Sequence, residues 1–173
     1  MSIIKKTVCE ENVWVAPGAR LMGHVTVGRD SSIWYNAVVR GDEASISIGK
    51  GSNIQDNCVI HADHGDVCSV GDGTTIGHSA IIHGCRVGDN TVIGMGSIVL
   101  NGAEIGNNCI IGAGSLVTQN TRIPDDMLAF GRPAKPVRPL SPEEIERNRE
   151  NANHYVLLKN EHEVLANSTG DDL

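Results

Sequence analysis

The stretch Val87–Ile123, VGDNTVIGMGSIVLNGAEIGNNCIIGAGSLVTQNTRI, repeats itself every six residues. An aliphatic residue returns at each sixth position: Val87, Ile93, Val99, Ile105, Ile111, Val117 and Ile123. A small side chain usually stands four residues after each of them, as at Thr91, Ser97 and Ala103. A six-residue period with two inward positions is typical of a short strand and a turn, and the 3.6-residue period of a helix is absent. The stretch therefore predicts an all-β solenoid.

The same period extends back toward the N-terminus. Its aliphatic positions there are Val15, Leu21, Val27, Ile33 and Val39, then Ile48, Ile54 and Ile60, then Val70, Ile76 and Ile82. These hexads resemble those of the left-handed parallel β-helix, in which three hexads form one triangular coil. The resemblance implies about six coils, with a first face that starts at Val15, a second at Leu21 and a third at Val27. The left hand rests on this resemblance, because crossover rules alone favour a right-handed connection.

Three irregularities interrupt the repeat. Three extra residues lie within Val39–Ile48, four extra residues lie within Ile60–Val70, and one residue is missing within Ile82–Val87. Insertions in a solenoid become loops, and such loops often carry function. The middle of the chain is therefore where we expect a functional site.

The repeat ends at Pro124, and a Pro-rich connector follows. We predict that the β-helix with this connector occupies residues 1–138. Ser141 is a helix-capping residue, Pro142 suits the first turn, and Glu143 and Glu144 suit the positive end of a helix dipole. A helix over 139–165 is therefore predicted to pack back on the β-helix, with residues 166–173 as a disordered tail.

Composition limits the function classes. The net charge of -7 and the pI near 5.4 argue against nucleic acid, because phosphate binding needs a basic face. No apolar run approaches the ~18 residues of a membrane span, and the first residues do not read as a signal peptide. Five cysteines without a CxxC pair favour a reduced, cytoplasmic setting. Only 3% of the residues are aromatic, so the core should be aliphatic.

Three histidines stand out once the coils are assigned. His61 and His83 each follow the aliphatic residue of the second face, in adjacent coils, and Arg40 has the same position one coil earlier. Stacked strands lie ~4.8 Å apart, so both imidazoles can reach one ion. A lone histidine is more often an ordinary surface residue, and His24, His154 and His162 are interpreted in that way.

His78 has a different position in the repeat. It stands two residues after Ile76 on the first face, where Asp56 stands one coil earlier. A corner of the prism separates it from His61 and His83. A neighbour related by threefold symmetry could supply its own His78, so the pattern predicts a homotrimer with a metal site at each subunit interface.

Three motifs surround these histidines: RGDE at 40–43, NIQDNCVIH at 53–61 and TIGHSAIIHGC at 75–85. In this combination they resemble the γ-class carbonic anhydrases and their bacterial relatives with a short loop. The resemblance covers roughly residues 10–138. It implies a lyase that hydrates carbon dioxide reversibly to bicarbonate, with His61, His78 and His83 holding zinc, or iron or cobalt. Three neutral nitrogen ligands leave one position open for a metal-bound hydroxide that attacks the substrate.

The resemblance also implies roles for other residues. Gln55 would hydrogen-bond the metal-bound water or the substrate, and Glu43 resembles the family's proton-shuttle glutamate. Arg40 and Asp56 would pair across the interface, and Asp42 would support them; a plain surface ion pair is the alternative. Tyr155 would reach the site from the helix of some subunit, or would only pack.

The chain departs from the family pattern after His61. The archetype has a longer acidic loop with a second glutamate, whereas this loop is the short ADHGDVCS. His64 stands in it and could shuttle protons, since an imidazole titrates near neutral pH, or could be an exposed loop residue. The departure puts fast hydration in doubt.

Three other functions stay open. The GRPAK segment at 131–135 also follows the hexads of coenzyme A-dependent acyltransferases, although these use a histidine base without a metal trio. A thioesterase would use the same hydroxide on an acyl-CoA. A non-enzymatic trimer would use the metal only to hold its subunits together.

Overall fold

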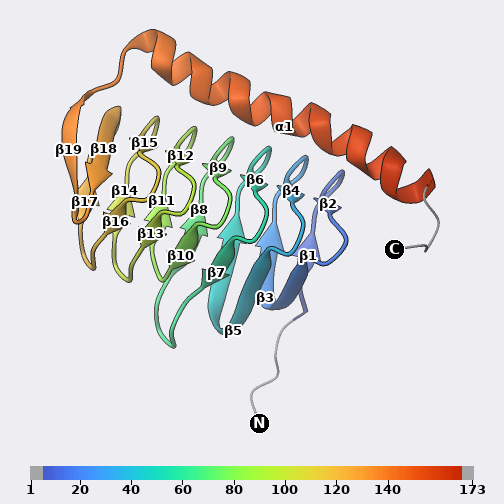
Figure 1. Ribbon diagram of the computed structural model, residues 1–173. Coiled ribbons are helices and arrows are strands. Elements are labelled where there is room, and N and C mark those ends of the chain that lie inside the picture. The colour runs from blue at the N-terminus through green and yellow to red at the C-terminus, as the bar shows by residue number, and fades with distance from the viewer. Residues whose placement is uncertain (1–5, 169–173) are drawn as a thin grey trace.

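The computed structural model describes residues 6–168, and its short strands wind in successive coils, as Figure 1 shows. The predicted parallel β-helix is confirmed, because every strand pair except the last one, β18 with β19, is parallel and joins the same positions of adjacent coils. The left hand of the coil stays a prediction. Among the described residues, no helix is both long and apolar enough to cross a membrane.

The first face is an eight-stranded sheet. Its strands are β2 (Trp14–Val15), β4 (Ser32–Ile33), β6 (Asn53–Ile54), β9 (Thr75–Ile76), β12 (Val92–Ile93), β15 (Ile110–Ile111), β18 (Met127–Gly131) and β19 (Ala134–Pro139). Without the antiparallel β19, the strands mark about 7 coils, one more than the sequence predicted. The extra coil is β18, which escaped notice because the small Ala129 stands opposite Ile111 where an aliphatic residue was expected.

The second and third faces form one eleven-stranded sheet. The long strands β3 (Arg20–Val27) and β5 (Val38–Ile48) turn the corner between the two faces. The second face continues in β7 (Val59–His61), β10 (Ile81–His83), β13 (Ile98–Val99) and β16 (Leu116–Val117). The third face contains β1 (Val8–Cys9), β8 (Cys68–Val70), β11 (Arg86–Val87), β14 (Glu104–Ile105) and β17 (Arg122–Ile123). The strand β1 precedes the recognised repeat, and it pairs with β3.

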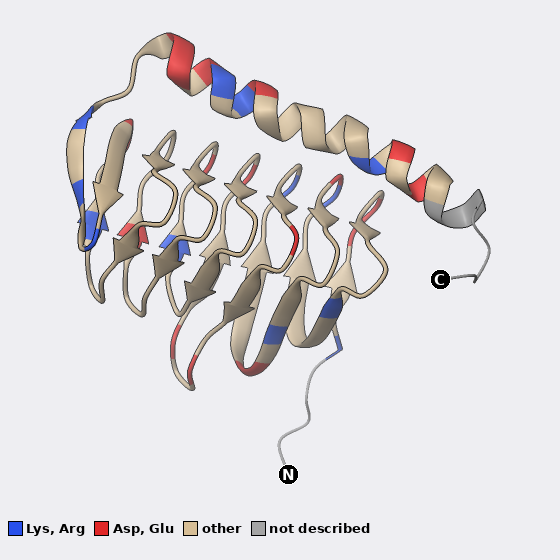
Figure 2. Ribbon diagram, in the orientation of Figure 1, with Lys and Arg blue, Asp and Glu red and all other residues tan. Residues whose placement is uncertain are grey.

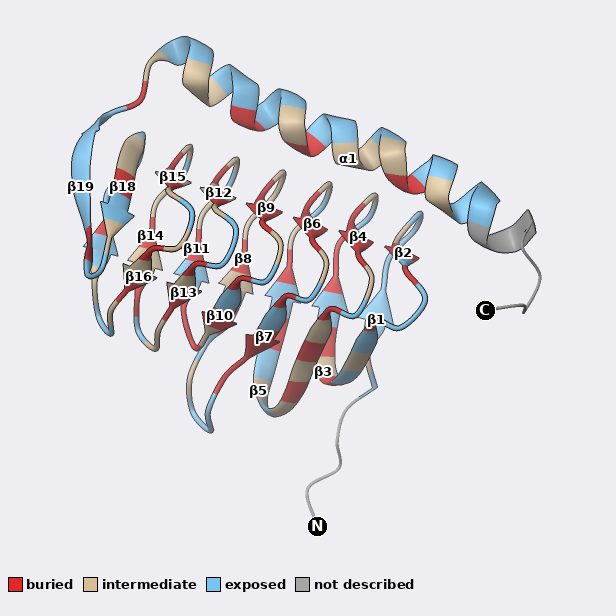
Figure 3. Cartoon of the chain, viewed as in Figure 1, coloured by how far each residue is buried: buried red, intermediate tan, exposed pale blue. Residues whose placement is uncertain are grey.

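The core is aliphatic, as predicted. Ile33, Ile54, Ile76, Ile93 and Ile111 are fully buried in one stack on the first face, and the other two faces contribute similar stacks. Figure 3 shows buried positions recurring in coil after coil. Each coil adds a small apolar layer, so the core extends along the axis instead of forming a sphere.

Hydroxyl groups are buried at several of the small inward positions. Ser52 donates to the Gly71 carbonyl at 2.7 Å, and Thr74 donates to the Gly88 carbonyl at 2.7 Å. Such contacts satisfy groups whose burial would otherwise be costly. The glycines permit close coil stacking, because a Cβ at Gly71 would lie 2.6 Å from the Gly88 carbonyl carbon.

The helix α1 (Pro142–Ser168) runs back along the first face (Figure 1). It starts and ends three residues later than predicted. The start shifts because Pro139 still belongs to β19 and Ser141 caps the helix, and no Pro or Gly stops it at 166–168. The predicted tail thus overlaps the helix through Ser168, and residues 169–173 lie outside the described part. Asn148 donates to the carbonyls of Asn90 and Cys109, which fixes the middle of α1 to the solenoid.

An aromatic cluster fixes the later part of α1 to the first coils. Trp34 packs edge-on against Trp14 and Tyr155, with ring centroids 5.0 Å and 5.3 Å apart. The Tyr35 hydroxyl hydrogen-bonds His162 Nδ1 at 3.0 Å. The interpretation of His162 as a surface residue was wrong, since its ring packs against both tryptophans. The few aromatic rings of the chain are thus concentrated where the helix docks.

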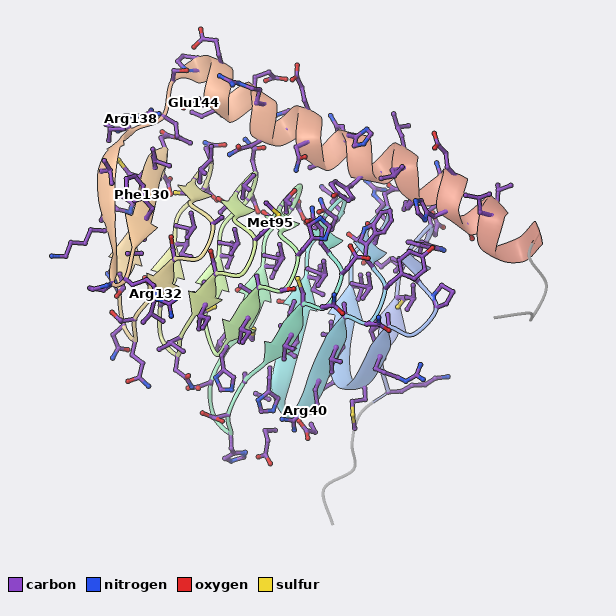
Figure 4. The ribbon with its side chains drawn as sticks, in the orientation of Figure 1. Arg40, Met95, Phe130, Arg132, Arg138 and Glu144 are labelled. Atoms are coloured by element: carbon purple, nitrogen blue, oxygen red, sulfur yellow. The ribbon has the colours of Figure 1, made fainter. Side chains whose placement is uncertain are left out.

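The N-terminus of α1 carries a capping box. The Ser141 amide donates to Glu144 Oε2 at 2.9 Å, and the Glu144 amide donates to Ser141 Oγ at 3.3 Å. Arg138 forms two further hydrogen bonds to the Glu144 carboxylate, at 2.7 Å and 2.8 Å, and the two side chains lie together in Figure 4. The hydrogen bonds from Arg138 and from the Ser141 backbone lower the pKa of Glu144 from 4.5 to about 2.

This low pKa predicts an acid-dependent contribution to stability. Because the folded-state pKa of Glu144 lies below its unfolded value of 4.5, ionisation stabilises the fold above that pH, and the contribution is lost as pH falls toward about 2. Urea unfolding of the native chain and of Glu144→Gln should therefore differ most at neutral pH and converge in acid. A difference that stays constant with pH would contradict the assignment.

Candidate metal centre

His61 and His83 lie side by side at the end of the second face. They pair across adjacent strands, and Arg40 stands opposite His61 one coil earlier, so the predicted register is confirmed. His61 Nδ1 lies 3.1 Å from His83 Nε2. The His61 side chain is 11% exposed and that of His83 is 26% exposed, so both rings are largely shielded from water.

Asp42 contacts the ring nitrogen of His61 that does not face His83, and Arg40 contacts Asp42. His61 Nε2 lies 3.2 Å from Asp42 Oδ1, and Arg40 contacts the other carboxylate oxygen at 2.5 Å. Desolvation opposes the ionisation of Asp42, but the hydrogen bond and charge of Arg40 outweigh it and hold the pKa of Asp42 below its usual value. The carboxylate is therefore a permanent hydrogen-bond acceptor for the imidazole, as is common behind metal-binding histidines.

The loop between β7 and β8 covers His83. Asp63 Oδ1 lies 3.9 Å from His83 Nε2, and Asn101 Oδ1 lies 2.9 Å from His83 Nδ1. The Asn101 amide nitrogen donates to Asp63 Oδ2 at 3.0 Å and to Asp66 Oδ2 at 2.6 Å. Figure 2 shows acidic residues, coloured red, along the ribbon of this loop. The ligand atoms of His61, Asp63 and His83 all lie within 4.8 Å of one another.

The two histidines fit a metal ion. Two nitrogen ligands of tetrahedral zinc lie about 3.3 Å apart when each bond is ~2.0–2.1 Å, which is close to the observed 3.1 Å. Both rings are partly buried, and each has a polar partner on its other nitrogen. This donor set suits zinc, iron or cobalt better than magnesium or calcium, which prefer oxygen ligands.

His78 lies on a different face, as its register predicted. Its Nδ1 lies 2.8 Å from Asp56 Oδ2, and its backbone amide donates to Gln55 Oε1 at 3.1 Å. Its side chain is 44% exposed at the corner of the first face. The structure thus brings His61 and His83 together within one chain, while His78 points outward with Asp56. A neighbouring subunit as the source of the third ligand stays a prediction.

Gln55 is the most buried of the predicted catalytic residues. It is buried, and its amide nitrogen donates to Asn53 Oδ1 at 3.1 Å. Asn53 in turn donates to Thr75 Oγ1, which also accepts from Asn151 of α1. The amide keeps one free hydrogen and one free lone pair for a substrate or water.

The remaining predicted residues differ in their exposure and in their partners. Glu43 and His64 are exposed, Glu43 in the corner segment of β5 and His64 in the loop after β7. Tyr155 packs against Trp34, and burial together with the charge of Asp56 raises the pKa of its phenol. Within the chain Arg40 pairs with Asp42 and Asp56 pairs with His78, so the predicted Arg40–Asp56 pair across the interface stays a prediction.

Asp63 and Asn101 are the residues that sequence reasoning missed. Asp63 stands two residues after His61, so its proximity offered a signal. Asn101 lies one coil beyond His83, two residues after Val99, and it looked like an ordinary turn residue.

Comparisons with known proteins identify the family of this chain. The family model described as bacterial transferase hexapeptide (six repeats) matches residues 6–41 and 84–119. A protein of Methanocaldococcus jannaschii, named "Probable carbonic anhydrase", is 54% identical over 86% of this chain and 93% of its own length. The mitochondrial gamma carbonic anhydrase 2 of Arabidopsis thaliana is 43% identical over 91% of this chain, which spans only 59% of that relative. A Bacillus cereus structure described as an acetyltransferase has a TM-score of 0.91 and 41% identity, covering 93% of this chain and 94% of its own.

Proposed function

Because this chain belongs to the family of hexapeptide-repeat γ-carbonic anhydrases, we propose that it catalyses the reversible hydration of carbon dioxide to bicarbonate. The observation that carries the proposal is the 3.1 Å approach of His61 Nδ1 to His83 Nε2 in a partly buried site. Two imidazoles in this arrangement form half of a tetrahedral site that needs one more protein ligand.

His61 and His83 of one subunit and His78 of a neighbour would hold the metal, with zinc as the first candidate and iron or cobalt as others. The bound metal would supply Lewis acidity that makes a nucleophilic water oxygen available near neutral pH. Asp42 orients His61, and Arg40 holds Asp42. Gln55, fixed by Asn53 and by the His78 amide, would orient the substrate with its free amide hydrogen.

The exposed residues Glu43 and His64 are our candidates for moving the product proton to solvent. Each belongs to one of the two inserted segments near the histidine pair, and both are exposed. Tyr155 lies within electrostatic reach of Asp56, so it could contribute a hydroxyl beside His78.

The proposal requires a homotrimer, and the second face offers a surface for it. Outward apolar residues stack in register along this face: Val38, Val59, Ile81, Ile98 and Leu116. Val59 and Ile81 remain 37% and 38% exposed in the single chain. We call these five residues the apolar ridge. Its members Val59 and Ile81 stand two residues before His61 and His83 in the same strands, so packing against the ridge would bring a neighbour close to the site.

An acyltransferase or thioesterase is the second candidate, favoured by the 0.91 TM-score to the Bacillus cereus structure described as an acetyltransferase. The GRPAK segment lies in the hairpin of β18 and β19, at the far end of the solenoid from β2. This position gives the segment no contact with the histidine pair. A further candidate is a non-enzymatic trimer in which the metal only holds the subunits together.

Four assays on one preparation separate these functions. Full-length protein purified without chelator should contain about one metal ion per chain and should hydrate carbon dioxide in a stopped-flow pH assay. The same protein should not transfer an acetyl group from acetyl-CoA. Metal content without hydration, combined with hydrolysis of acyl-CoA, would overturn the carbonic anhydrase proposal and favour a thioesterase. Absence of metal after addition of zinc or iron(II) would contradict the histidine site itself.

A further inference from the structure

Asn101 connects three parts of the candidate metal centre. Its side-chain oxygen faces His83 Nδ1 at 2.9 Å, and its side-chain nitrogen faces Asp63 and Asp66 at 3.0 Å and 2.6 Å. One amide thus bridges a histidine of β10 and two carboxylates of the loop after β7.

The two carboxylates fix the orientation of this amide. An ionised carboxylate only accepts hydrogen bonds, so the side of Asn101 that faces Asp63 and Asp66 must be the NH2 group. The oxygen of Asn101 then has to face His83, and it can only accept. A neutral His83 ring therefore carries its hydrogen on Nδ1 and presents a lone pair on Nε2.

The same reasoning applies to His61 from the opposite side. Asp42 accepts from His61 Nε2, so the neutral ring of His61 presents a lone pair on Nδ1. The two lone-pair atoms are the ones that lie 3.1 Å apart. No hydrogen stands between them in this tautomeric state, so both lone pairs are available to one cation.

We propose that Asn101 is a positioning residue that sets the tautomer of His83 and ties the loop of Asp63 and Asp66 to the metal centre. Its effect on metal affinity rests on the proposed function, whereas its effect on the ring state of His83 does not. Partners of this kind behind a ligand histidine typically change metal affinity by about 10–100-fold.

The test uses full-length protein labelled with 15N-histidine, with metal removed, and long-range 1H–15N spectra that identify the protonated ring nitrogen. Native His83 should be protonated on Nδ1, with its signals assigned by their loss in His83→Gln. Asn101→Ala should show both tautomers of His83 and should weaken zinc binding about 10–100-fold in a chelator competition. Asn101→Asp should restore the Nδ1-protonated ring and bind zinc more tightly than Asn101→Ala, because a carboxylate oxygen still accepts from His83.

Asn107→Ala is the matched control. Asn107 also bridges neighbours, accepting from the Asp89 amide and donating to Asp125, but it stands in the turn after β14. It should change neither the His83 spectrum nor zinc affinity. Protonation of native His83 on Nε2, or native zinc affinity in Asn101→Ala, would overturn the proposal. A native chain with the expected ring state but without carbon dioxide hydration would contradict the proposed function and support the role of Asn101.

Discussion

Replacement of His83 by alanine is expected to abolish both metal binding and carbon dioxide hydration. His83 supplies one of the two nitrogen atoms that one chain brings to the centre, so its loss leaves His61 as the single histidine of that pair. Elemental analysis should fall from about one metal ion per chain to background, and hydration should fall to the uncatalysed rate. The fold should persist, because the side chain is 26% exposed and lies outside the aliphatic core.

His24→Ala is the control for this experiment. His24 contacts Ser45 at the corner of β3 and β5, and it has no contact with the paired histidines. It should retain metal and activity. Full hydration activity in His83→Ala would rule out this site as the catalytic centre, while loss of activity with metal retained would indicate that the metal is bound elsewhere.

Replacement of Ile81 by glutamate is expected to dissociate the trimer and remove the metal with it. Ile81 lies in the middle of the apolar ridge, between Val59 and Ile98. Threefold symmetry places the substitution in all three interfaces, so each would have to bury an uncompensated carboxylate at a cost of several kcal/mol. Light scattering should report monomers. Because the third ligand comes from the neighbour in our proposal, metal content should fall in parallel.

Ser47→Glu offers a matched surface change. Ser47 is an exposed outward residue of β5 on the third face, where the proposal places no subunit contact. This variant should remain trimeric and loaded with metal. An Ile81→Glu protein that stays trimeric would exclude the ridge as the interface. An Ile81→Glu monomer that still binds metal tightly would show that His61 and His83, with a local ligand such as Asp63, are sufficient.

The sequence predicted much of this arrangement because a six-residue period fixes register. Once Ile60 and Ile82 are assigned to one face, His61 and His83 have to stack, and the structure pairs them. The same counting placed His78 and Asp56 at one position of adjacent coils, and they are in contact. Periodicity works here because most strands are two or three residues long and every strand pair except β18 with β19 is parallel.

The contacts that escaped prediction come from segments outside the period. The loop of Asp63 and Asp66 is an insertion, so no register places its carboxylates beside Asn101. The coil at β18 has Ala129 where the repeat has a larger aliphatic residue. The strand β19 pairs antiparallel with β18, and the hexad pattern does not predict this reversal. The aromatic cluster depends on how α1 docks, and that is a tertiary property.

The path of α1 changes how the solenoid should respond to unfolding. A simple stack of coils behaves as a one-dimensional array, in which the ends fray independently because each unit touches only its neighbours. Here the helix begins at the last coil through Arg138 and Glu144 and reaches the first coils through Tyr35 and His162. The two ends of the array are thereby coupled through a single rigid element, so fraying at one end has to loosen the helix and with it the other end. We therefore expect the chain to unfold as one cooperative unit.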